Sequence, residues 1–275
     1  MRNGNHTKLG VLPLLSYLSA LAVTLTAAGG IWLPETYQHE TTSWAAQGMG
    51  QDYVDLFFVV PLQLGTTYLA AKGRRGALLV LGGIFGYLVY SYFLYCFCVH
   101  FNRLFLLYCA ALGCSSYGLI LLALKLQGEK NDAWFDRNLP TLFPAFYLIL
   151  TALAFYGLWL SEDLPALFAG TRPKSLEEVG LPSNPVHVLD LSLILPAMLL
   201  AGVALLQKRS FGYFSFPIMM VLCAVMAVAI GGMTAMMAYK GLVPDRTISW
   251  TFGGMALADT AVLAYFLRSL KDRNL

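Results

Sequence analysis

The chain has 275 residues, of which 58% are hydrophobic and only 12% are charged, and its formal net charge is +3. Soluble domains carry about twice that share of charged residues, so the composition excludes an ordinary soluble domain and indicates a multi-pass membrane protein. The basic residues lie between apolar blocks, where they act as topology signals. The sequence therefore does not predict a nucleic-acid-binding surface.

Apolar blocks long enough to cross a bilayer follow one another along the whole chain. They cover residues 11–33, 52–71, 77–99, 104–126, 139–160, 186–206, 213–239 and 247–267. The first block is longer than the apolar core of a signal peptide, so we expect an uncleaved first helix. The predicted fold class is an all-α polytopic membrane protein with eight transmembrane helices.

The basic residues are distributed unevenly between the two sides of these helices. If the N-terminus is cytoplasmic, thirteen of the 18 Lys and Arg residues lie in inner segments and five in outer ones. This bias follows the positive-inside rule. It predicts a multi-pass plasma (inner) membrane protein with both termini in the cytoplasm, and it places the loops 34–51 and 161–185 outside.

Four short patterns occur twice, in the same order, in the two halves of the chain. They are GIWLPE (30–35) and GLWLSE (157–162), DYVDLFFVVP (52–61) and HVLDLSLILP (187–196), KGRRG (72–76) and KRSFG (208–212), and Asn102-Arg103 and Asp245-Arg246. Matches in this order predict two tandem four-helix units, residues 1–128 and 129–275. An even number of helices gives both units the same orientation, which makes the repeat parallel.

Three stretches of the chain carry a resemblance to known sequences. They are GQDYVDLFFVVPLQL (50–64), GYLVYSYFLYCF with FNRLFLLY (86–108), and HVLDLSLILPAMLL (187–200). They resemble segments of an uncharacterised group of multi-pass bacterial inner-membrane proteins with no established activity. The resemblance implies a bacterial-type inner-membrane protein, and it transfers no catalytic or binding residue.

The second and sixth predicted helices each carry a polar pair near their outer ends. Asp52 and Asp55 share one helix face, and so do His187 and Asp190, because residues three apart are neighbours on a helix. If the two helices meet, the four groups form an outward-facing site for a solute, a cation or a proton. Asp55, His187 and Asp190 are then weak candidates for metal ligands. The alternative is helix capping, which is the simpler interpretation of Asp52.

Each of these helices also has a proline six residues after an aspartate, Asp55 in one and Asp190 in the other. Pro61 and Pro196 are expected to kink their helices. Paired helix breaks at matching points of two halves are typical of transporter binding sites. A packing kink without a ligand remains the alternative.

Other polar groups are expected deeper in the membrane. Asp259 lies near the middle of the eighth helix, where a carboxylate costs several kcal/mol unless it is paired, hydrated or protonated. Tyr87 and Tyr90 share a face of the third helix and are expected to line a polar cavity or to bind a carboxylate such as Asp55. Trp32 and Trp159 are expected to be interfacial anchors in the two halves.

These patterns predict a protein that binds or transports a small solute, a cation or a proton between the second and sixth helices. An intramembrane enzyme acting on lipid or quinone, with His187 and a carboxylate as acid and base, is an alternative. A structural or assembly subunit of a membrane complex is another. The expected partners are the lipid bilayer and a small solute or cation, and no pattern indicates a cofactor or a protein partner.

Overall fold

A computed structural model describes residues 9–127, 131–136, 139–242 and 246–271. Its α-helices are α1 (Leu12–Trp32), α2 (Thr42–Val54), α3 (Val60–Ala71), α4 (Arg75–Cys98), α5 (Phe105–Gln127), α6 (Leu142–Ala169), α7 (Lys174–Val179), α8 (Pro185–Leu189), α9 (Leu195–Leu206), α10 (Ser210–Tyr239) and α11 (Arg246–Leu267). Four shorter helical turns are η1 (Pro34–Tyr37), η2 (Asp55–Val59), η3 (Asn131–Trp134) and η4 (Asp190–Ile194). No strand is present in these ranges.

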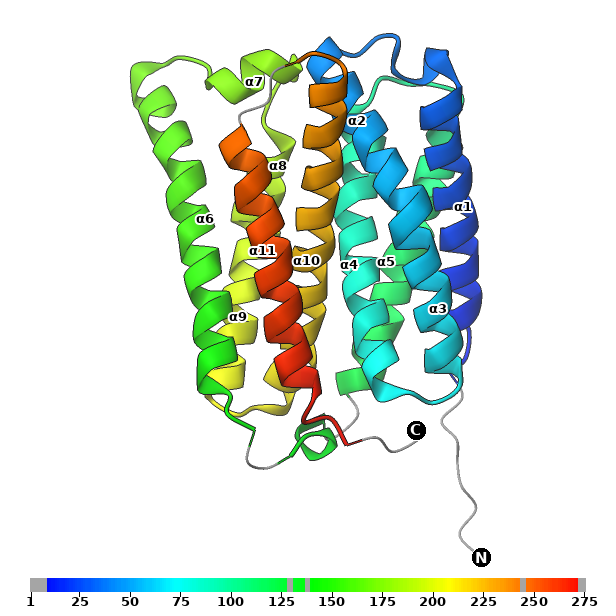
Figure 1. The fold of residues 1–275 in the computed structure, drawn as a ribbon, viewed down its shortest axis with the longest axis vertical. Coiled ribbons are helices and arrows are strands. Elements are labelled where there is room, and N and C mark those ends of the chain that lie inside the picture. Colours follow the sequence, from blue (N-terminus) through cyan, green and yellow to red (C-terminus); the bar gives the residue numbers. More distant parts are fainter. Residues whose placement is uncertain (1–8, 128–130, 137–138, 243–245, 272–275) are drawn as a thin grey trace, which may run out of the picture.

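The chain is an all-α membrane protein, and the eight predicted transmembrane helices are confirmed. Two of them are composite. Residues Thr42–Ala71 form rod two, in which η2 joins α2 to α3, and residues Pro185–Leu206 form rod six, in which η4 joins α8 to α9. The beginning of α1 and the end of α11 lie at one end of the bundle, the η3 end, and η1 and α7 lie at the opposite end, the η1–α7 end (Figure 1).

Two predicted helix boundaries are wrong. Rod two begins at Thr42, ten residues before the predicted start, and Thr41 caps it by accepting a hydrogen bond from the Trp44 N–H. The first turns of this helix are rich in polar residues, so the apolar pattern does not extend over them. Asp52 therefore lies well inside a helix and does not cap one. Likewise α6 continues past the predicted end at residue 160 to Ala169, where Gly170 at φ 65° ends it.

The aspartates of rods two and six each open a widened helical turn. η2 and η4 are π turns, in which the N–H groups of Val60 and Leu195 donate to the carbonyls of Asp55 and Asp190, five residues earlier. Pro61 and Pro196 come immediately after these donors. Proline has no N–H, and its ring collides with the carbonyl four residues before it, so a widened turn accommodates both prolines.

The helices form two side-by-side groups that follow the chain (Figure 1). The first unit contains α1 to α5 and the second contains α6 to α11, and α10 packs against both α4 and α2 where the units meet. Gly50 and Gly232 allow the crossing of α2 and α10, since a Cβ on Gly50 would lie 2.5 Å from the Gly232 carbonyl oxygen. The two π turns lie at corresponding places of the two predicted units, but the tandem repeat stays a prediction, and Asp245 lies outside the described residues.

Candidate functional site

Asp52 is fully buried among side chains of three elements. The Tyr37 hydroxyl, from η1, donates to Oδ2 at 2.5 Å, and the Tyr95 hydroxyl, from α4, donates to Oδ1 at 2.7 Å. Gly30 of α1 lies against the same carboxylate, and a Cβ there would be 1.7 Å from Oδ2. Burial, reinforced by the negative charge of Asp52, raises the pKa of Tyr37 well above its ordinary value, so Tyr37 remains a neutral donor.

Asp55 lies one turn further along rod two and is less well satisfied. The Tyr87 hydroxyl donates to Oδ1 at 2.7 Å, whereas Oδ2 is buried without any hydrogen-bond partner. None of the ion pairs seen among the described residues involves Asp55 or Asp52. Two carboxylates thus share a buried helix face with tyrosine hydroxyls as their partners and no basic residue to balance a charge.

A group of stacked tyrosines surrounds the two carboxylates. The ring centroids of Tyr92 and Tyr95 are 5.2 Å apart, and so are those of Tyr95 and Tyr108. The Tyr92 hydroxyl hydrogen-bonds Thr26 of α1, and the Tyr108 hydroxyl accepts from Asn102. These contacts hold α4 against α1 and α5, and they fix the Tyr95 ring, whose hydroxyl binds Asp52 of rod two.

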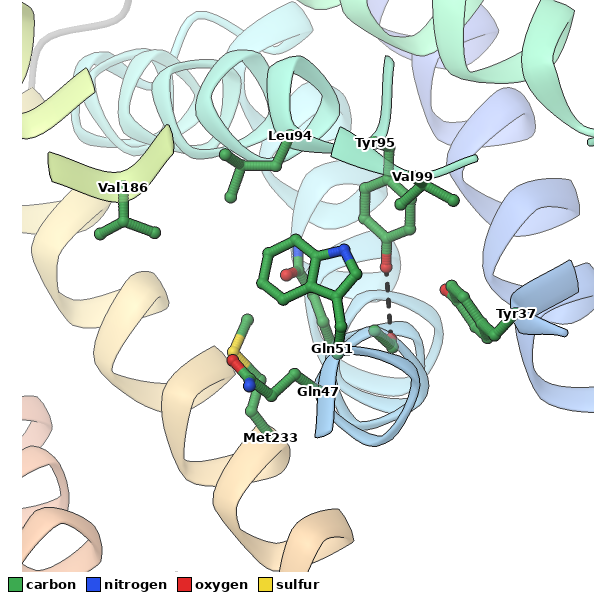
Figure 2. Close-up of a pocket in the computed structure, with 10 residues that line it drawn as sticks. Tyr37, Gln47, Gln51, Leu94, Tyr95, Val99, Val186 and Met233 are labelled. Atoms are coloured by element: carbon green, nitrogen blue, oxygen red, sulfur yellow. Dashed lines mark hydrogen bonds between the residues drawn. The ribbon is translucent and has the colours of Figure 1, made fainter. Parts of the chain in front are cut away.

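A small pocket is lined in part by Tyr37 and Tyr95, the two tyrosines that bind Asp52 (Figure 2). It offers about 60 Å³ to water-sized molecules, enough for a few waters or a small ion. Its walls include Gln47 and Gln51 of rod two, Val186 of rod six and Met233 of α10. Tyr37 and Tyr95 also line it, and the buried Gln51 Nε2 has no hydrogen-bond partner. The hydroxyls that bind Asp52 therefore lie between the pocket and the buried carboxylates.

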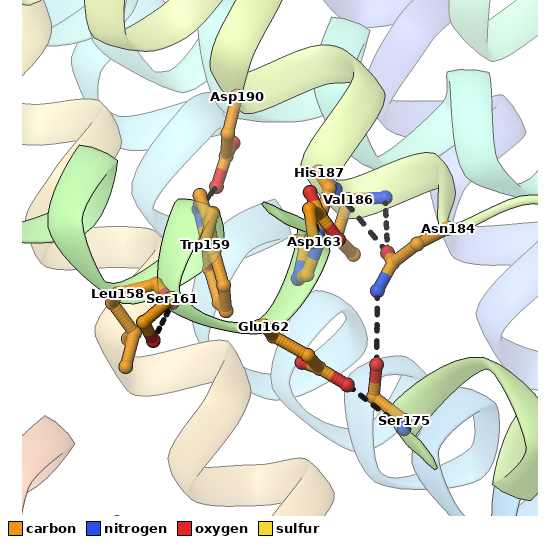
Figure 3. Close-up of polar contacts among 10 residues, drawn as sticks. All are labelled: Leu158, Trp159, Ser161, Glu162, Asp163, Ser175, Asn184, Val186, His187 and Asp190. Carbon is orange, nitrogen blue, oxygen red and sulfur yellow. Dashed lines mark hydrogen bonds and ion pairs between the residues drawn. The ribbon is translucent and has the colours of Figure 1, made fainter. Parts of the chain in front are cut away.

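The second unit has a polar group of its own near the same end (Figure 3). The Trp159 indole N–H donates to Asp190 Oδ2 at 2.9 Å, and the Tyr90 hydroxyl also interacts with Asp190. His187 Nδ1 lies 2.9 Å from Asp163 Oδ1, and its ring packs on Trp159 with centroids 4.3 Å apart. These contacts tie rod six to the end of α6.

The four predicted polar residues divide into two groups with different partners. Tyr87 and Tyr90 of α4 face different carboxylates: Tyr87 binds Asp55 and Tyr90 meets Asp190. The described residues contain no group of three or more His, Cys, Asp or Glu that could hold a metal ion. The expected quartet, and the metal site that Asp55, His187 and Asp190 were to form, is therefore not assembled in this part of the chain.

Asp259 is buried near the middle of α11, with 1% of its surface exposed. The Tyr147 hydroxyl of α6 donates to Oδ1 at 2.7 Å, and Oδ2 has no partner. Tyr147 and Asp259 thus repeat the arrangement of Tyr87 and Asp55: each carboxyl group has one hydroxyl donor, one unpartnered oxygen and no ion pair among the described residues.

Sequence reasoning missed four functional side chains. Trp159 was expected to be an interfacial anchor, but its indole N–H donates to Asp190, and the Tyr95 hydroxyl donates to the buried Asp52. Tyr37 and Asp163 lie in segments that were expected to be outer loops. The available signal was the spacing of eight residues between Tyr87 and Tyr95 on α4, which places both hydroxyls along the antiparallel rod two.

No protein-family model matches the chain, and neither a curated protein nor a solved structure shows significant similarity to it. Function must therefore be inferred from the side chains and their contacts. The resemblance of three segments to an uncharacterised bacterial membrane group remains an expectation.

Proposed function

We propose that this integral membrane protein transports a small solute or cation and that Asp55 exchanges a proton during transport. The observation that carries the proposal is the environment of Asp55, which is 0% exposed, has one hydrogen-bond donor and has one oxygen without a partner. An ionised carboxylate in such a place costs several kcal/mol. A bound proton, or a bound cation, removes that cost.

The pocket and Asp52 provide a route from the η1–α7 end to Asp55. Tyr37 and Tyr95 line the pocket and donate to the two oxygens of Asp52. Hydroxyl groups can both donate and accept, so they can pass a proton between water in the pocket and a carboxylate. Asp52 and Asp55 lie on one face of rod two, three residues apart, which makes Asp55 the next acceptor.

The π turn η2 begins at Asp55, the residue proposed to exchange a proton. Asp55 is its first residue, and its carbonyl accepts the N–H of Val60 five residues later. Widened turns of this kind occur frequently at functional sites, because the local backbone is less tightly bonded than an α-helix. We place the η1–α7 end, and with it the pocket, on the outer side of a plasma (inner) membrane on the strength of the positive-inside bias.

Proton flux into liposomes tests the proposal. The purified full-length protein is reconstituted with an entrapped pH-sensitive dye, and a potassium diffusion potential, negative inside, is set with valinomycin. We expect proton entry faster than in protein-free liposomes, reduced to the protein-free rate by Asp55→Asn and lowered by Asp52→Asn.

The matched control is Glu177→Gln, which removes an acidic group from the exposed surface of α7. This variant should retain the flux of the native chain. Flux that persists in full after Asp55→Asn, or a native chain that conducts no protons above the protein-free rate, would contradict the proposal.

A further inference from the structure

The second unit contains a buried acid that the proposed function does not use. Asp259 is held by α11 against α6, with its Oδ1 bound by the Tyr147 hydroxyl at 2.7 Å and its Oδ2 unpartnered. Only 1% of its surface is exposed. An ionised carboxylate buried in a membrane with a single hydroxyl donor is as unfavourable at Asp259 as at Asp55. A bound proton removes that cost at either residue.

The corresponding contact in the first unit is neutral. The repeat places Asp259 of α11 near Ser115 of α5, and Ser115 hydrogen-bonds Ser19 of α1 at 2.8 Å. The first and last helices of each unit are therefore bridged at matching places, by two hydroxyls in one unit and by a phenol and a carboxyl in the other. Two serines satisfy each other, so the helix junction does not itself require an acid. The carboxyl of Asp259 is an addition to the second unit.

Few titratable groups face Asp259. Tyr147 faces it from α6, and the Cys223 thiol faces it from α10, on the side that also faces Asp190. The Cys223 sulfur lies 4.0 Å from the Met198 sulfur of α9. No ion pair among the described residues includes Asp259, so no positive side chain compensates a negative charge there.

From this geometry we propose that Asp259 is a second proton-binding site, separate from Asp55, so that each chain holds one exchangeable proton in each four-helix unit. The proton binds at the carboxyl group, and the Tyr147 hydroxyl is the hydrogen-bond partner of that group. This site does not depend on the transport cycle proposed for Asp55.

Infrared spectroscopy of the native full-length protein in lipid bilayers at neutral pH tests the site. A protonated carboxyl group gives a carbonyl-stretching band that ionised carboxylates lack, and the band moves in heavy water if the proton exchanges. We expect Asp259→Asn to remove one such band, and Asp55→Asn to leave that band in place. The surface variant Glu177→Gln should remove neither.

Two further readouts extend the test, and the first of them does not require Asp259→Asn to fold. Tyr147→Phe removes the hydroxyl donor, so the Asp259 carbonyl band should move to higher frequency in a chain that retains the acid. The S–H stretching band of Cys223, identified by its loss in Cys223→Ala, should shift in Asp259→Asn and not in Asp55→Asn.

The second site is overturned if Asp259→Asn removes intensity from the ionised carboxylate bands instead, or if the Tyr147→Phe spectrum shows no band displacement. The Asp55 proposal fails independently, through an absent Asp55 band or an absent proton flux. The two failures are therefore distinguishable.

Discussion

Asp52 and Gly30 form the closest side-chain fit around the candidate site. Because a Cβ at position 30 would lie 1.7 Å from Asp52 Oδ2, either the carboxylate or the helix α1 must move when a side chain is added. Any such movement also displaces the Tyr37 hydroxyl, which donates to the same oxygen. The small residue therefore positions the acid as well as permitting helix packing.

Gly30→Ala should destabilise the folded protein by about 1–3 kcal/mol, as overpacking of a closely packed site does. Thermal unfolding in detergent measures this effect. Gly157→Ala is the matched control, since Gly157 is the repeat counterpart of Gly30 and a Cβ there meets no atom within 4 Å. Equal melting temperatures for the two variants would contradict the assigned role of Gly30.

The residues of the site were predictable in part. Asp55, Tyr87 and Asp259 were selected because polar groups in apolar segments need partners, and each has such a partner in the structure. Asp52 was interpreted as a cap because the apolar pattern begins next to it. Its true surroundings depend on Tyr37, which reaches it from another segment, and no local pattern reports such a contact.

Trp159 joins two elements of the second unit, the end of α6 and the π turn η4. Its indole N–H donates to Asp190 at 2.9 Å, and its ring stacks on His187 of α8. The repeat counterpart, Trp32, is 63% exposed. Trp159 therefore holds two elements together, whereas Trp32, at the corresponding place of the predicted repeat, faces the surroundings of the protein.

Trp159→Phe should reduce stability by about 1–3 kcal/mol, because the partly buried Asp190 carboxyl group loses a hydrogen-bond donor while an aromatic ring is kept. Trp32→Phe should leave the melting temperature unchanged. The comparison is made by thermal unfolding of both variants in the same detergent. A Trp159→Phe protein as stable as the native chain would show that this hydrogen bond does not hold rod six to α6.

The lengths of the helices were harder to predict than their existence. Hydropathy located all eight transmembrane helices because each needs an apolar core of bilayer thickness. It missed the first ten residues of rod two and the last nine of α6, because polar residues interrupt the apolar pattern there and contacts with distant segments, such as that of Asp163 with His187, help to hold the helix. The π turns were anticipated only as proline kinks, since the sequence shows where a proline interrupts the hydrogen bonding but not whether the helix bends or widens there.

At the scale of the whole molecule, the two predicted four-helix units meet where α10 packs against α2 and α4, and residues of α2, α4 and α10 line the candidate pocket. The site takes its proton from outside only if the η1–α7 end of the bundle faces the outer side of the membrane. The charge bias predicts that it does.

Cysteine labelling tests this orientation in a chain whose five native cysteines are replaced. Glu177→Cys, on the exposed surface of α7, should react with a membrane-impermeant maleimide in intact cells. Lys208→Cys, in the turn between α9 and α10, should react only after the membrane is permeabilised. Labelling of Lys208→Cys, and not of Glu177→Cys, in intact cells would reverse the proposed topology.

The most direct test of the central claim is the protonation state of Asp55 in the bilayer. The carbonyl-stretching region of the infrared spectrum, recorded for the native protein and for Asp55→Asn at neutral pH, reports it without knowledge of the solute. The account predicts a protonated carboxyl band that exchanges in heavy water and disappears in the variant. An Asp55 that is ionised at neutral pH, with no cation bound, would contradict it.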